Sequence, residues 1–146
     1  MVVASKAICD RMDEIYRLAK NVMEFYHYGV QESAYHAGLE WELKNNGFVV
    51  ESEQMFNMWY RGVKLDKTYK MDLVINHNLI IELKTKEELS SEHRLQLFNY
   101  MRLVNMEWGL LINFSPLGVD VERYRYYPQD NIVRLFDRYG NAVFNN

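Results

Sequence analysis

The stretch Asp72-Leu-Val-Ile-Asn-His-Asn-Leu-Ile-Ile-Glu-Leu-Lys84 decides how this chain folds. Two apolar segments flank its polar Asn-His-Asn cluster, which is typical of a tight hairpin turn. Charged side chains are costly to bury unless they are paired, hydrogen-bonded or metal-bound. Yet Asp72 enters the first apolar segment, and Glu82 and Lys84 interrupt the second. Side chains alternate between faces along a strand, so Glu82 and Lys84 share a face, and the hairpin brings Asp72 back toward them.

An Asp, a Glu and a Lys at one end of a sheet form a candidate divalent-metal site for phosphodiester chemistry. Hard cations such as Mg²⁺ prefer carboxylate and carbonyl oxygens. A bound metal can activate water and polarise a phosphoryl oxygen, and a nearby lysine can stabilise developing negative charge. The alternative is an aspartate in a turn beside a Glu–Lys pair on an exposed sheet face. These three residues alone leave both interpretations open.

Three helices are expected, and two of them carry further candidate site residues. The first covers 5–27, and the second covers about 31–45 and ends at an Asn-Asn-Gly signal. On the second helix Glu32 shares a face with Tyr35, Leu39 and Leu43, which predicts that its carboxylate points inward. The alternative is a glutamate that only stabilises the helix N-terminus.

The third helix, capped by Ser90 or Ser91, reaches about residue 104. It places His93, Gln96 and Tyr100 on one face at i, i+3 and i+7. Such a polar trio can hydrogen-bond a phosphate, a base or the water of a metal site. Ordinary boundary positions would explain the trio as well.

Strand segments are predicted at 48–50, 55–60, 63–65, 69–75, 79–84, 108–114 and 119–126, with a short apolar run at 132–136. The order of helices and strands predicts an α/β or α+β sheet with helices packed on it. A length of 146 residues fits a single domain over 1–146.

The amino-acid composition limits the kinds of function that the chain can have. Hydrophobic residues make up 49% and charged residues 25%, which is ordinary for a soluble protein, and no apolar stretch is long enough to cross a membrane. A lone cysteine, Cys9, excludes an intrachain disulfide and favours a cytoplasmic location. The net charge of −3 argues against a protein that coats nucleic acid, so any phosphate-binding surface must be local. Two segments, 61–70 and 123–138, hold four Lys or Arg residues each, and they are either a binding patch or solvated charge.

Several motifs together resemble one family. Gly29-Val-Gln-Glu-Ser-Ala-Tyr35 matches G-x-x-E-x-x-Y, the signature of the GxxExxY proteins, which belong to the PD-(D/E)XK nuclease superfamily. The similarity continues through Tyr60-Arg-Gly-Val-Lys-Leu, Asp72, Glu82-x-Lys84, His93-x-x-Gln96-x-x-Asn99-Tyr100 and Gly109-Leu-Leu-Ile-Asn-Phe114. It covers about residues 10–126, and the tail at 127–146 has no counterpart.

The resemblance implies a restriction-endonuclease-like core, a central mixed sheet flanked by helices with a Mg²⁺ or Mn²⁺ site at its edge. It implies that the metal ligands are Asp72, Glu82, the backbone carbonyl of Leu83 and Glu32. Lys84 would be the catalytic lysine. Gln96 and Tyr100, with His93 on the same helix face, would position the substrate.

The leading hypothesis is therefore a metal-dependent nuclease that acts on DNA, with RNA left open. The alternative is a catalytically weak or inactive module of the same fold that binds nucleic acid or a protein. A third interpretation is a subunit that needs a homodimer or another partner protein, since 14% of the residues are aromatic and Tyr124, Tyr126 and Tyr127 cluster.

Overall fold

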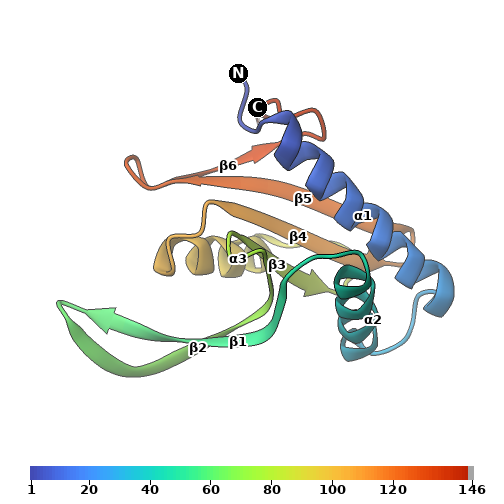
Figure 1. The fold of residues 1–146 in the computed structure, drawn as a ribbon, viewed down its shortest axis with the longest axis horizontal. Coiled ribbons are helices and arrows are strands. Elements are labelled where there is room, and N and C mark those ends of the chain that lie inside the picture. The colour runs from blue at the N-terminus through green and yellow to red at the C-terminus, as the bar shows by residue number, and fades with distance from the viewer. Residues whose placement is uncertain (145–146) are drawn as a thin grey trace.

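The computed structural model describes residues 1–144, in which helices flank one six-stranded sheet (Figure 1). The elements are α1 (Lys6–Tyr26), α2 (Glu32–Asn45), β1 (Val50–Tyr60), β2 (Val63–Ile75), β3 (Leu79–Lys84), α3 (Ser91–Leu103), β4 (Trp108–Ser115), β5 (Gly118–Tyr127) and β6 (Ile132–Phe136).

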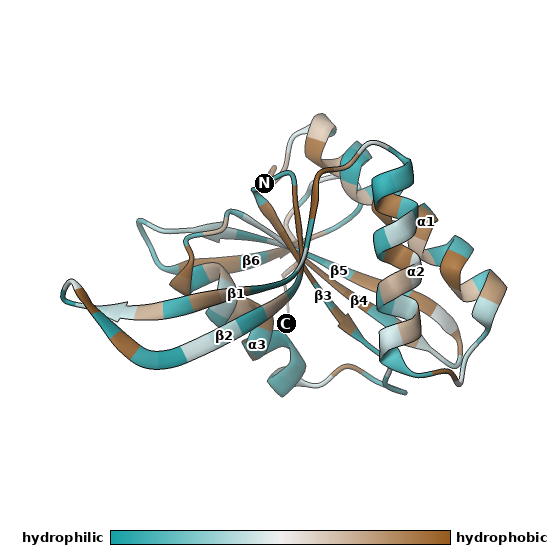
Figure 2. Cartoon of the chain, turned by 60° about the horizontal axis from the view of Figure 1, so that its bottom comes forward, coloured by the Kyte–Doolittle hydropathy of each residue, from teal (hydrophilic) through white to brown (hydrophobic). Residues whose placement is uncertain are grey.

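The sheet is mixed, with its strands in chain order from β1 to β6. Neighbouring strands run antiparallel except β3 and β4, which are parallel and joined by the crossover through α3. Helices α1 and α2 pack on one face and α3 on the other, and each face has its own apolar core. The two central strands are apolar along most of their length (Figure 2) because both of their faces are covered. The predicted mixed sheet flanked by helices is confirmed.

The predicted hairpin between β2 and β3 is confirmed in detail. Asn76 and His77 both have positive φ, at 50° and 62°, and the Asn78 N–H donates to the Ile75 carbonyl at 3.1 Å. This is a type I′ turn, whose twist suits an antiparallel pair and which asparagine tolerates well. The turn sets the register that brings the end of β2 beside the end of β3.

The strands before this hairpin are longer than predicted. The expected segments 48–50 and 55–60 are one strand, β1, which leaves Phe48 and Val49 outside it; 63–65 and 69–75 are likewise one strand, β2. The residues between the predicted segments, 51–54 and 66–68, are polar, so they lack the apolar side chains by which the segments are predicted. Cross-strand pairing continues through 51–54, and the far part of the β1–β2 ribbon projects away from the body of the protein (Figure 1).

The tail beyond residue 126 completes the fold. Its apolar run is β6, and the residues that follow fold back on the N-terminus. The Val3 N–H donates to the Gly140 carbonyl at 2.7 Å, and the Ala142 N–H donates to the Met1 carbonyl at 2.9 Å. The two ends of the chain therefore lie together (Figure 1). Within residues 1–144, no helix has the length and apolar character needed to span a membrane.

Candidate active site

Asp72 and Glu82 meet where the β2–β3 ladder opens. The ladder's last pair on this side is Leu73 with Ile81, so the next pair would be Asp72 with Glu82. Instead their side chains bridge the diverging strands. Glu82 Oε1 accepts a hydrogen bond from the Asp72 N–H at 3.3 Å, and Asp72 Oδ2 accepts one from the Leu83 N–H at 2.8 Å. Both carboxylates are thus fixed by backbone groups at the floor of a cleft.

Glu82 is the most electrostatically unusual group of the site. It is only 2% exposed. Burial first, and the neighbouring Asp72 carboxylate second, raise the pKa of Glu82 to about 9. A carboxylate in this position holds a proton at neutral pH unless a cation displaces it.

The Lys84 side chain faces the same cleft and is held by α3. Its Nζ donates to Gln96 Oε1 at 2.7 Å, and Gln96 Nε2 donates to the Tyr100 hydroxyl at 3.0 Å. Burial of Tyr100 raises the pKa of its hydroxyl, so it stays neutral and can accept this hydrogen bond. The structure thus brings three predicted residues together in one polar chain, in the same cleft as Asp72.

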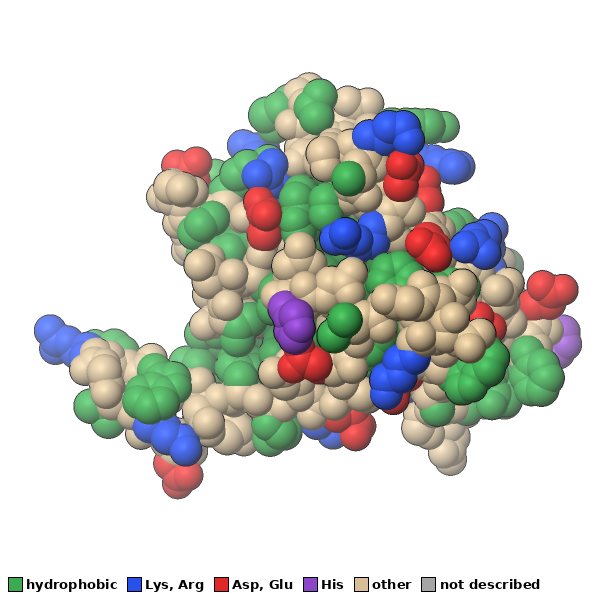
Figure 3. All heavy atoms as spheres, in the orientation of Figure 1, with side chains coloured by type: hydrophobic (Ala, Val, Ile, Leu, Met, Phe, Trp, Pro, Cys, Tyr) green, Lys and Arg blue, Asp and Glu red, His purple; other side chains and the backbone are tan. Residues whose placement is uncertain are grey.

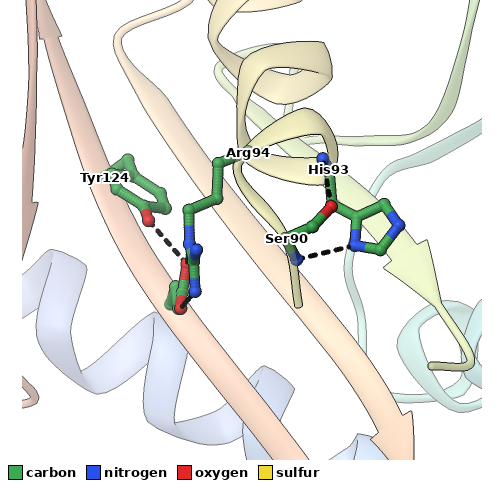
Figure 4. Close-up of polar contacts among 5 residues, drawn as sticks. Ser90, His93, Arg94 and Tyr124 are labelled. Carbon is green, nitrogen blue, oxygen red and sulfur yellow. Dashed lines mark hydrogen bonds and ion pairs between the residues drawn. The ribbon is translucent and has the colours of Figure 1, made fainter. Parts of the chain in front are cut away.

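Helix α3 is fixed to the sheet by a partly buried ion pair. Arg94 contacts Glu122 on β5 through two hydrogen bonds of 2.8 Å, and the Tyr124 hydroxyl donates to the same carboxylate at 2.6 Å (Figure 4). Burial alone would raise the pKa of Glu122, but the hydrogen bonds from Arg94 and Tyr124 outweigh it and leave that pKa lowered. This anchor sets where Gln96 stands over the cleft.

His93 lies at the start of α3, where it caps the helix. Its Nδ1 accepts from the Ser90 N–H at 3.0 Å, and its own N–H donates to Ser90 Oγ at 3.4 Å (Figure 4). Burial, and then the positive charges of Lys84 and Lys86, lower the pKa of His93. The predicted Ser90 cap is present. His93 is not among the residues that line the cleft, unlike the other two members of the trio.

The G-x-x-E-x-x-Y motif closes on itself before α2. The Tyr35 hydroxyl donates to the His27 carbonyl and accepts from the Gly29 N–H at 3.2 Å. Gly29 has φ 117°, a conformation that side chains rarely allow. Tyr35 is fully buried and stacks on Phe114, with ring centroids 4.5 Å apart. The first and last residues of the motif therefore fix the turn that starts α2 at Glu32.

Glu32 lines the cleft from α2, although its side chain is exposed to solvent. Partial burial by the cleft wall, followed by the Asp72 carboxylate, raises its pKa. The expected buried face is present at Tyr35, Leu39 and Leu43, but the carboxylate lies beyond the core rather than inside it.

The cleft has a volume of about 830 Å³ and includes residues that the sequence did not indicate. His36 and Glu40 of α2 line it, and His36 Nε2 lies 2.8 Å from Ser52 Oγ on β1. The i, i+4 spacing of His36 and Glu40 is the sequence signal that could have found this pair. Lys70 and Glu53, from the base of the projecting ribbon, line the opposite wall.

The donor set at the cleft floor fits a hard cation. Backbone N–H groups hold Asp72 Oδ2 and Glu82 Oε1, so the second oxygen of each carboxylate can share the Glu82 proton or, once that proton is displaced, bind a cation. The N–H and C=O of a strand residue point to the same side, so the Leu83 carbonyl is directed toward Asp72 as its N–H is. Residues 1–144 contain no cluster of three His, Cys, Asp or Glu ligands, which leaves Glu32 outside the immediate group.

Comparison with known proteins agrees with this geometry. The family model described as the PD-(D/E)XK nuclease superfamily matches residues 10–125. Among solved structures, the crystal structure of SSO0001 is similar, with a TM-score of 0.50 and 23% sequence identity. The alignment covers 80% of this chain and 61% of the SSO0001 chain. At this identity the likeness supports the fold alone. No curated protein sequence matches the chain. The family model matches most of the chain, and the sheet is mixed, with the expected residues brought together in one cleft. The chain therefore belongs to the PD-(D/E)XK nuclease superfamily.

Proposed function

We propose that this chain is a Mg²⁺- or Mn²⁺-dependent nuclease that hydrolyses phosphodiester bonds, with DNA as its first substrate and RNA as the alternative to be tested. One observation carries the proposal. Asp72, Glu82 and Lys84 converge on the floor of a single open cleft, each fixed by a named hydrogen bond.

The carboxylates of Asp72 and Glu82, with the Leu83 carbonyl, would hold the cation, and Glu32 would contact it through water. A divalent cation there would supply positive charge against the scissile phosphate and lower the pKa of water. Because Glu82 is buried beside another carboxylate, its ionised form needs such a charge nearby. The backbone hydrogen bonds to both carboxylates keep their orientation set before substrate arrives.

Lys84 would act on the reacting phosphate directly. Its ammonium group has three N–H donors, and among the described residues one of them is used, by Gln96. The remaining donors can contact a nonbridging phosphate oxygen as its negative charge grows. Gln96, held in turn by Tyr100, is a positioning residue that keeps the ammonium over the cleft floor.

We also place the chain in the GxxExxY branch of the superfamily. The support is the contact between Gly29 and Tyr35, the two outer residues of the motif. Together they fix the turn before Glu32, which gives the spacing of the motif a structural reason.

The test is a cleavage assay on single-stranded DNA, double-stranded DNA and RNA with Mg²⁺, Mn²⁺ or EDTA. The wild type is compared with Asp72→Asn and Lys84→Ala. Lys20→Ala and Glu24→Gln, both on the exposed face of α1, are the matched charge controls. We expect cleavage that needs the metal, a loss of about 10²- to 10³-fold with Lys84→Ala, and wild-type rates in both controls.

Cleavage that survives Asp72→Asn or Lys84→Ala would refute the site assignment. Binding without cleavage under every metal condition would instead support the inactive module. Cleavage that appears only at high protein concentration would support the need for a homodimer.

A further inference from the structure

The projecting part of the β1–β2 ribbon, residues 55–70, forms an arm beside the cleft. Its segment 61–70 carries Arg61, Lys64, Lys67 and Lys70 against the single acidic residue Asp66, in a chain whose net charge is −3. All five are exposed. In Figure 3 the arm projects at the lower left, with blue basic and green hydrophobic side chains close together and one red acidic group.

One face of the arm continues the wall of the cleft. The cross-strand neighbours Asn57 and Thr68 mark this outer face, since directly opposed residues project from the same side. Beyond a register shift in the ladder, Trp59 is the cross-strand neighbour of Lys64. Thr68, and Lys70 two residues further along the strand, also line the cleft that holds Asp72. A polymer lying in the cleft can therefore extend along the outer face without crossing an edge.

The other face of the arm is anchored near the catalytic lysine. Phe56 and Tyr69 stack with centroids 5.4 Å apart, and both pack on Tyr100 at 5.8 and 6.0 Å. Tyr100 is the residue that holds Gln96 against Lys84. The base of the arm and the cleft thus share one support, which fixes the direction of the outer face.

The outer face combines an exposed aromatic ring with exposed lysines. Trp59 is 63% exposed and has Lys64 as its cross-strand neighbour. Lys70 lies 3.6 Å from Glu53, but both side chains are largely exposed, so this pair is weak and can rearrange. Exposed tryptophan beside lysine is the combination that binds unpaired nucleotides, since the ring stacks on a base while the cations neutralise phosphates.

Two arginines of the second basic segment are used within the fold. Arg123 pairs with Asp13 of α1, and Arg125 pairs with Glu107 and donates to the Val3 carbonyl. These arginines connect parts of the fold, whereas the cations of the arm face solvent.

We propose that the arm binds a single-stranded stretch of the substrate as it leaves the cleft, with Lys70 and Lys64 at phosphates and Trp59 stacked on a base. The two lysines are six positions apart along β2, a span of at most about 20 Å because the ladder is irregular between them, and this is the length of about six stacked nucleotides. This inference rests on the proposed function for the identity of the polymer, and it adds where the polymer lies and that it is unpaired there.

The test measures binding without cleavage, in EDTA, by fluorescence anisotropy of a labelled oligothymidylate of about 20 nucleotides. Trp59→Ala is matched with Trp41→Ala, because Trp41 on α2 is also 63% exposed but does not line the cleft. Lys64→Ala is matched with Lys20→Ala. We expect Trp59→Ala to weaken binding about 5- to 150-fold, and Lys64→Ala to lower the slope of log K against log salt by about 0.7.

The controls should bind as the wild type does, and a duplex of the same length should lose nothing on Trp59→Ala because its bases are already stacked. Thermal unfolding of each variant checks that the fold is intact, and we expect these exposed substitutions to leave the unfolding temperature almost unchanged. Unchanged binding with Trp59→Ala, an equal loss with Trp41→Ala, or no binding by the wild type would each overturn the proposal. If the protein cleaves nucleic acid but the arm substitutions do not change binding, only the arm proposal is refuted. If the protein binds through the arm and never cleaves, only the proposed nuclease function is refuted.

Discussion

Replacing Glu82 with glutamine should remove a loss of stability that the metal-free protein suffers as pH rises. Burial and Asp72 raise the pKa of Glu82 from 4.5 to about 9. Between these values the folded protein keeps a proton that the unfolded chain has released, so its stability falls as pH rises. The contribution is fully present below about pH 4.5 and is lost as pH approaches 9. The slope is at most about 1.4 kcal/mol per pH unit, or about 3 kcal/mol over two units.

The assay is urea denaturation in EDTA at several pH values between about 6 and 8. Glutamine has the shape of the protonated acid and cannot ionise, so Glu82→Gln should gain about 1.4 kcal/mol per pH unit relative to the wild type. Glu122→Gln is the matched control. The pKa of Glu122 is lowered, so its carboxylate is already charged in both states above about pH 5 and adds no slope there.

Adding Mn²⁺ connects the same proton to metal binding. A cation that occupies the site must displace the proton of Glu82, so its stabilising effect on the wild type should grow with pH. Glu82→Gln should lose most of this effect. If the free energy of unfolding changes equally with pH for wild type and Glu82→Gln in EDTA, Glu82 does not hold a buried proton. If Mn²⁺ stabilises both proteins equally, Glu82 is not a ligand.

Three further substitutions test the support of the site. Lys84→Met keeps nearly the length of the side chain without its charge. It should slow single-turnover cleavage about 10²- to 10³-fold and leave the urea midpoint almost unchanged. A midpoint that falls together with the rate would indicate that Lys84 stabilises the fold instead. Tyr35→Phe leaves the Gly29 N–H without its partner and should cost about 1–2 kcal/mol in urea, and an unchanged midpoint would contradict that contact. Gly109→Ala places a Cβ 2.5 Å from the Met101 sulfur beneath α3, and should cost about 1–3 kcal/mol; full stability there would show that α3 shifts freely.

The sequence predicts that Asp72 and Glu82 lie together because these residues contradict their surroundings. A charged side chain inside an apolar strand is costly, so Asp72 and Glu82 stand out from their neighbours without any structure. The turn between them is set by local chemistry, since asparagine accepts positive φ and one turn type fixes the register. Both signals lie within one short hairpin, so no long-range information is needed.

What the sequence left undetermined depends on contacts between distant segments. His93 shares a helix face with Gln96 and Tyr100, but its imidazole nitrogen is used by the Ser90 backbone, which helical spacing alone does not reveal. His36 has a polar neighbour on its helix, yet it becomes part of the cleft only through Ser52 on a strand. Periodicity identifies which face a side chain occupies, and it does not identify what stands opposite.

The arm is a second feature that the sequence predicts incompletely. The sequence misses the strand at 66–68 in the arm, and at 51–54 just before it, because these residues are polar and strand prediction depends largely on apolar side chains. The length of the arm is instead maintained by pairing between β1 and β2, and by three aromatic rings at its base. An extended ribbon that exposes tryptophan and lysine gains little stability from those residues, so a structural role does not account for their presence. Binding of a substrate would account for the exposed tryptophan and lysine. In the arm, a substrate interaction is therefore a better explanation for these residues than packing.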